Sequence, residues 1–299
     1  MRLDGRRRSG NIIDRRGSTG GGGIHFGGGG NGLRIGGIGG VAGILIVAAI
    51  IWLSGGNPLD VLQGSQYGYN VVSNEGQYTP TAHEEELAGF SSQILAGTED
   101  VWTAKFREMG RTYVPPKMVF YTGSVNSACG GATAAVGPFY CSADQTIYID
   151  LSFFDQMERE MGAGGDFAYA YVIAHEVGHH VQYLLGTLEE AHSRMARTSE
   201  KEANKLSVRT ELQADYYAGV WANGDNEMFG SLEEGDIEEG LNAASKIGDD
   251  YLQKQARGYA QPETFNHGTS AQRVRWLKKG ASTGNVYGGD TFSPAYENL

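Results

Sequence analysis

The sequence predicts an α+β fold in which a small antiparallel or mixed sheet packs against helices, preceded by one transmembrane helix. Three observations predict it. Residues 35–53 are apolar and uncharged, residues 146–150 (T-I-Y-I-D) have strong β-propensity, and residues 166–185 and 199–222 have helical patterns. The chain has 299 residues, enough for one well-buried domain after a membrane segment and a linker.

The apolar run at 35–53 is nineteen residues long, sufficient to span a bilayer. Seven arginines and only two aspartates precede it. By the positive-inside rule, residues 1–34 are expected to be a basic, Gly-rich cytoplasmic tail, and the C-terminal part lies outside the cytoplasm. No A-x-A-like cleavage site follows the span, which favours an uncleaved single-pass anchor in the inner or cytoplasmic membrane.

The chain is acidic, with 24 Lys+Arg, 35 Asp+Glu and a formal net charge of −11. The excess of acid lies after residue 34, which argues against nucleic acid as a partner. Residues 54–80 are rich in Gly, Asn, Ser and Tyr without periodicity and are expected to be a linker. Residues 81–299 remain as the single folded domain.

The domain is expected to begin with two helices, 81–96 and 98–110, each opened by a capping threonine. A strand follows at 117–122. Cys129 and Cys141 flank a Gly-rich loop and, in an oxidising compartment, would close it with a stabilisation of roughly 3 kcal/mol. Two separate reduced thiols are the alternative, and metal binding is disfavoured because neither cysteine has a C-x-x-C partner.

A hairpin is expected around the turn-like residues 142–145, with 146–150 as its second strand. Its first strand contains Gly137, Pro138, Phe139 and Tyr140, and the proline confines that strand to a sheet edge. An edge strand can bind an extended peptide by strand addition. An ordinary edge hairpin without a ligand is equally compatible with the sequence.

Residues 166–185 predict a buried helix, with Asp166 as N-cap and Gly186 as C-terminal cap. It contains H-E-V-G-H. His175 and His179 lie one turn apart on one face, so both imidazoles can ligate one zinc ion. Glu176 lies beside the open coordination position, where a general base is required.

A catalytic zinc site needs a third protein ligand. The H-E-x-x-H-x-x-G-x-x-H pattern is excluded because Gln182 and Leu185 occupy its Gly and His positions. His180 points about 100° away from His179 around the helix. The surroundings of His192 are typical of a solvated helix or loop.

Glu211 is the better third ligand. Residues 199–222 predict a helix opened by an S-x-x-E capping box and stopped by the N-G at 223–224. Glu211 and Asp215 share one face of it, beside the small Ala214. Asp215 can then accept a hydrogen bond from the far nitrogen of a ligand histidine. An exposed helix carboxylate is the alternative for Glu211.

A T-x-x-Q capping box at 269–272 predicts a last helix through residue 279, with Gly280 after it. His267 precedes this helix and could hydrogen-bond an oxyanion, or could be a simple loop or capping histidine. Tyr216 and Tyr217 are alternative donors.

H-E-x-x-H followed by E-x-x-x-D on a later helix resembles the gluzincin arrangement of thermolysin-like peptidases. The resemblance implies a zincin-like domain with Zn²⁺, in which Glu211 joins the two histidines, Asp215 supports His175, and Glu176 is the base. It also implies the distal-histidine role for His267 and a substrate-binding edge strand. Nearly the whole chain resembles the bacterial neutral zinc metallopeptidase family of single-pass membrane proteins, through M-R-L-D-G-R-R-R-S-G-N-I-I-D-R-R-G, A-C-G-G-A, G-P-F-Y-C, A-H-E-V-G-H-H-V-Q, E-L-Q-A-D-Y-Y-A-G and F-N-H-G-T-S-A-Q-R-V-R-W.

These features predict a membrane-anchored zinc metallopeptidase that hydrolyses peptide bonds of a peptide or protein substrate. Two alternatives remain. One is a zincin-like, chaperone-type protein that binds peptides and has a structural metal site. The other is a zinc amidase that acts on cell-wall peptides. An open coordination position favours the enzymes over the binding protein.

Overall fold

The sheet of this α+β fold has four strands in the order β1-β2-β6-β5, as seen in a computed structural model that describes residues 1–18, 78–134 and 137–299. Strands β1 (Ile12–Asp14), β2 (Lys117–Tyr121) and β6 (Thr146–Asp150) are parallel, and β5 (Phe139–Cys141) runs antiparallel to β6. A separate hairpin joins β3 (Ser124–Ser127) to β4 (Gly130–Thr133). The mixed sheet agrees with the expected fold class.

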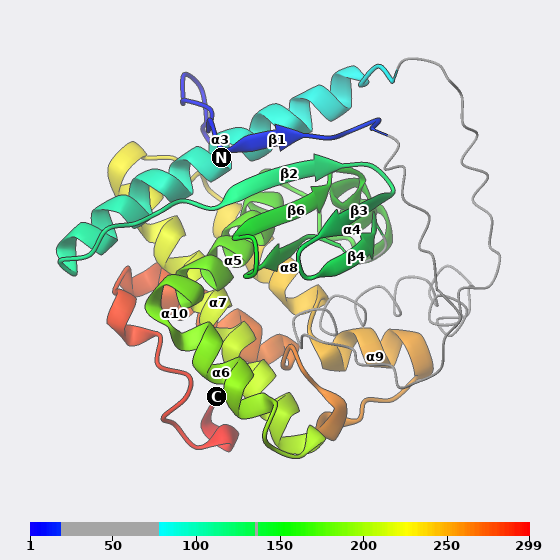
Figure 1. Cartoon of the computed structure of the whole chain (residues 1–299), viewed down its shortest axis with the longest axis vertical. Helices are drawn as coiled ribbons and strands as arrows, with labels where there is room; N and C mark the ends of the chain where they lie inside the picture. Colours follow the sequence, from blue (N-terminus) through cyan, green and yellow to red (C-terminus); the bar gives the residue numbers. More distant parts are fainter. Residues whose placement is uncertain (19–77, 135–136) are drawn as a thin grey trace.

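Helices pack beside the sheet (Figure 1). They are α3 (Ala82–Glu108), α4 (Ser152–Met161), α5 (Asp166–Leu185), α6 (Thr187–Met195), α7 (Glu200–Phe229), α8 (Asp236–Lys246), α9 (Asp249–Arg257) and α10 (Ser270–Thr283), with short 3-10 turns η2 (Pro262–Thr264), η3 (Val286–Gly288) and η4 (Tyr296–Asn298). The main core lies between these helices and the inner face of the sheet.

The expected hairpin is present, and β5 is an edge of the sheet. Strand β5 is shorter than the predicted first strand of the hairpin, because Gly137 and Pro138 precede the residues that pair with β6. The glycine has a φ of +69°, a conformation that L side chains rarely adopt. A disulfide joins Cys129 to Cys141 with 5.8 Å between the Cα atoms, and it ties β5 to the start of β4.

The prediction of two helices at 81–96 and 98–110 is wrong, since α3 is continuous through both. Thr81 caps it, as expected, and also forms a full capping box with Glu84. Thr98 is fully buried inside the helix and donates its hydroxyl hydrogen to the Leu95 carbonyl. A threonine satisfied in this way does not interrupt a helix.

Helix α7 packs against α5 on one side and α10 on the other. Glycine residues allow the backbones of both helix pairs to pack closely. A Cβ on Gly178 of α5 would lie 2.8 Å from the Ala214 carbonyl oxygen, and a Cβ on Gly280 of α10 would lie 2.0 Å from that of Tyr216. The predicted end of the last helix at Gly280 is therefore wrong, because this glycine is an interior contact and Gly284 is the cap.

Two further boundaries differ from expectation. Helix α7 passes through 223–224 and ends at Gly230, because Gly224 packs on Val101 and Asn223 donates to the Ala281 carbonyl. Helix α5 is preceded by Gly165 as N-cap, so Asp166 is its first residue and not its cap. Tertiary contacts override the local stop signal in α7.

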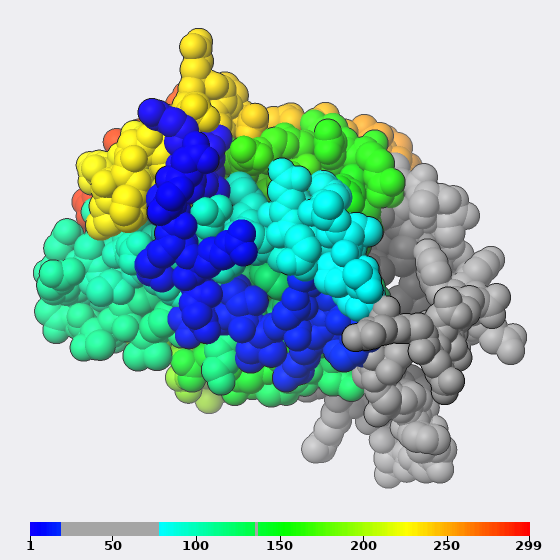
Figure 2. All heavy atoms as spheres, turned by 90° about the horizontal axis from the view of Figure 1, so that it is seen from above, coloured from blue at the N-terminus to red at the C-terminus, as the bar shows by residue number. Residues whose placement is uncertain are grey.

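Residues 1–18, the described part of the predicted cytoplasmic tail, are packed on the domain. Figure 2 shows them as a blue band beside α3. Arg6 makes a bidentate pair with the buried Asp225, at 2.7 and 3.0 Å. Arg7 binds Glu99 at 2.8 Å, and Ile12 pairs with Met118 in the sheet. The arginines neutralise acidic side chains of the domain.

The predicted span at 35–53 and nearly all of the 54–80 linker lie outside the described residues. Within the described ranges, no helix combines the length and apolarity needed to cross a bilayer. Gly17 and Tyr78 lie side by side, and a Cβ on Gly17 would be 2.1 Å from the tyrosine ring.

Candidate metal centre

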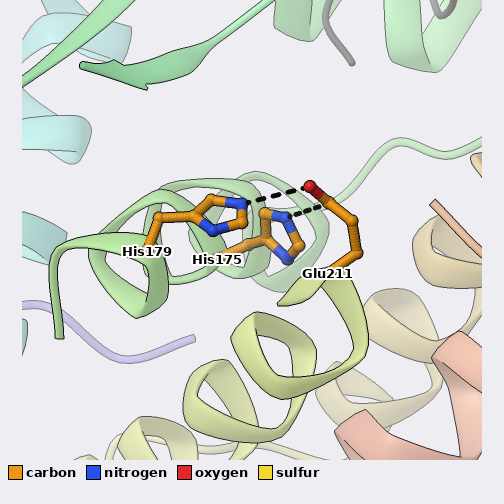
Figure 3. Close-up of side chains that lie close together, drawn as sticks. All are labelled: His175, His179 and Glu211. Atoms are coloured by element: carbon orange, nitrogen blue, oxygen red, sulfur yellow. Dashed lines mark hydrogen bonds and ion pairs between the residues drawn. The ribbon is translucent and has the colours of Figure 1, made fainter. Parts of the chain in front are cut away.

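His175, His179 and Glu211 meet where α5 crosses α7 (Figure 3). The Nε2 atom of His175 lies 3.2 Å from Oε2 of Glu211, and that of His179 lies 3.6 Å from Oε1. One ligand atom from each residue lies within 4.8 Å of the others. His175 and Glu211 are buried and His179 is nearly so. Two imidazoles and one carboxylate are the donor set of the two-His, one-Glu class of catalytic zinc site.

Asp215 supports His175, as expected. Its Oδ1 atom lies 2.8 Å from Nδ1 of His175 and accepts the hydroxyl hydrogen of Tyr171 at 2.6 Å. This arrangement places the Nδ1 hydrogen toward Asp215 and leaves Nε2 free for a metal. The carboxylate is fully buried, and the charges of Arg273 and His175 outweigh burial to lower its pKa to about 2.

Arg273 is part of the site and was missed in the sequence. Its Nε and Nη2 atoms donate to the two oxygens of Asp215 at 2.8 and 2.9 Å, and the side chain is 1% exposed. A signal existed, because Arg273 shares a buried face of α10 with Trp276, Leu277 and Gly280, at helical spacing. A charged residue in a buried stripe needs a charged partner.

The electrostatics of the metal-free cluster depend on burial and on mutual charge. Burial opposes the charged form of His175, yet Asp215 raises the pKa of that imidazole to about 10. Burial lowers the pKa of His179 to about 4. The imidazoles hold the pKa of Glu211 well below its usual range in spite of burial. In the metal-free cluster, Glu211 is therefore ionised and His175 carries an additional proton. A metal ion that binds His175 would displace this proton.

Glu176 is buried next to the ligand histidine. Burial raises its pKa to about 7, while the His175 charge and a backbone hydrogen bond from Tyr140 oppose that rise. The bond connects Glu176 to the edge strand β5. A carboxyl group with a pKa close to neutrality is suited to accept and return a proton.

His267 lies just before α10 and is 3% exposed. Its Nδ1 atom is 3.1 Å from Oδ1 of Asp249. Burial alone would lower the pKa of His267, but the Asp249 carboxylate outweighs this effect and raises it. The negative charge of Glu211 contributes to the same rise in pKa. Asp249 was missed, since nothing in G-D-D at 248–250 distinguishes it from a helix-opening acid.

The remaining candidates lie elsewhere. His180 binds the Val114 carbonyl and the Tyr140 hydroxyl, and His192 lies on α6. The Tyr216 hydroxyl donates to the Asn285 carbonyl, and Tyr217 packs edge-on against Trp102. Neither tyrosine is placed as an oxyanion donor.

The donor chemistry fits a zinc ion, because both ligand histidines have a partner at Nδ1 and direct Nε2 toward Glu211. No fourth His, Cys or carboxylate joins the group in residues 1–18, 78–134 and 137–299. Three protein donors leave a coordination position for water or substrate, as catalytic sites require.

Comparison with known proteins agrees with this arrangement. Residues 1–292 match the family described as "Putative neutral zinc metallopeptidase". The chain is 47% identical to the Escherichia coli K12 protein YpfJ over 98% of this chain and 99% of that protein. It is 45% identical to Rv2575 of Mycobacterium tuberculosis H37Rv over 61% of this chain and 64% of that protein. No solved structure matches it significantly. The chain therefore belongs to this family of zinc metallopeptidases.

Proposed function

We propose that this protein hydrolyses peptide bonds with a zinc ion held by His175, His179 and Glu211. The observation that carries the proposal is the meeting of these three donors next to the buried Glu176. When bound, zinc would lower the pKa of a water molecule and polarise the scissile carbonyl. The family to which the chain belongs supports a peptidase-type hydrolase.

Glu176 is the general base of this mechanism. It accepts a proton from the water that attacks the scissile carbonyl carbon, and then donates that proton to the amine that leaves. Its raised pKa favours both steps, since the carboxylate must bind the proton and release it again within one turnover.

His267 stabilises the oxyanion that develops on the scissile carbonyl. Asp249 favours the protonated imidazole, and a cationic donor in a buried site strengthens its hydrogen bond to negative charge. Edge strand β5 binds the extended substrate along the backbone edge that faces away from β6. The Tyr140 backbone hydrogen bond to Glu176 keeps this edge beside the general base. The peptide would then lie along β5 with one of its bonds at the metal.

The decisive test is Glu176→Gln. Because Glu176 is not a ligand in this proposal, the variant and the wild type should both hold about one zinc per chain. Its turnover of an unfolded protein substrate should fall by about 10²–10⁴-fold, the usual contribution of general base catalysis. Metal analysis and peptide release are measured on the same samples.

Glu189→Gln is the matched control, because it makes the same change at an exposed position of α6 and should alter neither quantity. Loss of zinc from Glu176→Gln would make Glu176 a ligand and refute the mechanism. Equal inactivity of wild type and variant on every peptide, with equal peptide binding, would favour the peptide-binding alternative.

A further inference from the structure

The second ligand histidine has a support of its own, made of two buried glutamines. Nδ1 of His179 lies 2.9 Å from Oε1 of Gln182, one turn further along α5. Gln182 is fully buried. Its Nε2 atom donates to the Thr210 carbonyl at 2.7 Å and to Oε1 of Gln213 at 3.0 Å. Both glutamines belong to sequence segments around the motifs, A-H-E-V-G-H-H-V-Q and E-L-Q-A-D, in which they had no assigned role.

The relay continues to the C-terminal segment. Nε2 of Gln213 donates to the backbone carbonyl of Gly289 at 2.8 Å. A carbonyl oxygen can only accept, so Gly289 fixes the orientation of the Gln213 amide. The Gln213 oxygen and the Thr210 carbonyl then both accept from Nε2 of Gln182 and together fix the orientation of that amide. The Gln182 oxygen then faces His179, which must carry its hydrogen on Nδ1. Nε2 of His179 is thereby left as the atom available to a metal.

Residues 289–294 are held on α7 by contacts that do not involve the relay. Thr291 donates its hydroxyl hydrogen to the Arg209 carbonyl at 2.6 Å, and the Arg209 guanidinium donates to the Pro294 carbonyl at 2.8 Å. Gln213 and Gly289 also line a surface cavity of about 410 Å³. The relay therefore runs from the metal site to a surface segment close to the C-terminus.

The structure assigns to this relay, Gln182, Gln213 and the Gly289 carbonyl, the role of positioning His179, so that metal affinity depends on docking of the C-terminal segment. The inference rests on the proposed metal site. His175 is positioned independently, by the Asp215 carboxylate and Arg273. Variants that each remove the support of a different histidine should have effects on zinc affinity that multiply. Two variants within the relay should not, because either one already interrupts it.

The test is a double-variant cycle on zinc affinity, measured by chelator competition with the full chain. Gln182→Leu should weaken binding by about 10–100-fold and Gln213→Leu by about tenfold, as changes behind a ligand do. The double variant should bind no more weakly than Gln182→Leu alone. Gln213→Leu combined with Asp215→Asn should instead show the product of the two single effects.

Gln93→Leu is the matched control, since it removes an amide that donates to the Leu3 and Arg6 carbonyls, away from the site. It should leave zinc affinity unchanged. Thr291→Val keeps every relay side chain and loosens only the C-terminal segment, so it should weaken zinc binding several-fold. The imidazole Nδ1 hydrogen of His179, observed by NMR in the metal-free chain, should exchange faster in Gln213→Leu and Thr291→Val.

The outcomes are distinguishable. A wild type that binds no zinc refutes the proposed function. A wild type that binds zinc, with unchanged affinity and unchanged Nδ1 exchange in Gln213→Leu, overturns the relay. Unchanged affinity and exchange in Thr291→Val overturn the dependence on the C-terminal segment, and multiplicative effects of Gln182→Leu and Gln213→Leu overturn their action as one unit.

Discussion

At the scale of single residues, buried charges are arranged in pairs that hold one another in place. Asp215 is matched by Arg273, and His267 by Asp249. In neither pair are the two residues close together in the sequence. The H-E-x-x-H and E-x-x-x-D patterns predicted the residues that meet at the candidate metal site, because one helical turn fixes their common direction. They could not predict Arg273 or Asp249, whose roles depend on where other helices pack.

The pair His267–Asp249 makes a prediction about pH. Asp249 raises the pKa of His267, so the cationic imidazole persists at low pH and is lost as the pH rises through that pKa. Asp249→Asn removes the negative charge and lowers the pKa. The alkaline limb of kcat/KM for the zinc-loaded enzyme should therefore move to lower pH.

The measurement is kcat/KM for peptide hydrolysis across the neutral and alkaline range. Asp250→Asn is the control, because Asp250 accepts from Ser270 and not from His267. A limb that stays in place in Asp249→Asn, or moves upward, would show that His267 is not the group that limits activity at high pH.

At the scale of elements, the site depends on three helices that approach closely through glycines. A residue larger than glycine at 280 would push α10 away from α7, since its Cβ would lie 2.0 Å from a backbone oxygen. Helix α10 carries Arg273 and α7 carries Asp215. The spacing of these helices therefore sets the geometry of the ion pair behind His175.

Gly280→Ala should lower the free energy of unfolding by about 1–3 kcal/mol, the usual cost of overpacking. It should also weaken zinc binding, because Arg273 moves with its helix. Urea unfolding and chelator competition measure the two effects. Gly10→Ala, where nothing lies within 4 Å of the added carbon, is the control. A Gly280→Ala variant with wild-type stability would contradict the close approach.

At the scale of the whole molecule, the N-terminal residues complete the domain. β1 extends the sheet beside β2, and Arg6 and Arg7 cover acidic side chains of α3 and α7. Gly17 and Tyr78 are adjacent, so the end of the segment 1–18 lies beside the start of the segment 78–134.

Arg6→Met should cost about 3–5 kcal/mol of unfolding free energy, because it leaves the buried carboxylate of Asp225 without its partner. Arg2→Met is the control, since Arg2 is 65% exposed and should change stability by no more than about 0.5 kcal/mol. Equal stability of the two variants would mean that residues 1–18 do not dock in solution.

Topology is tested in cells with single cysteines introduced at the exposed positions Gly10 and Glu297, labelled by a reagent that does not cross the membrane. Cys129 and Cys141 are already joined and do not compete. Docked residues 1–18 predict that both positions react, or neither. Reaction of only the C-terminal position would support the single-pass topology expected from the arginines, and would exclude the docked arrangement in that setting.

The sequence by itself determined what depends on neighbours along the chain. These features are the H-E-x-x-H spacing on α5, the Glu211–Asp215 face of α7, the helix caps at Thr81 and Thr269, and the edge hairpin. A turn, a cap or a strand is specified within a few residues. Tertiary structure alone decided where α7 and α10 end, how each histidine is supported, and that residues 1–18 join the domain. These results depend on contacts between residues far apart in sequence, such as Arg6 with Asp225 or Gln213 with Gly289, and packing of this kind overrides local propensity.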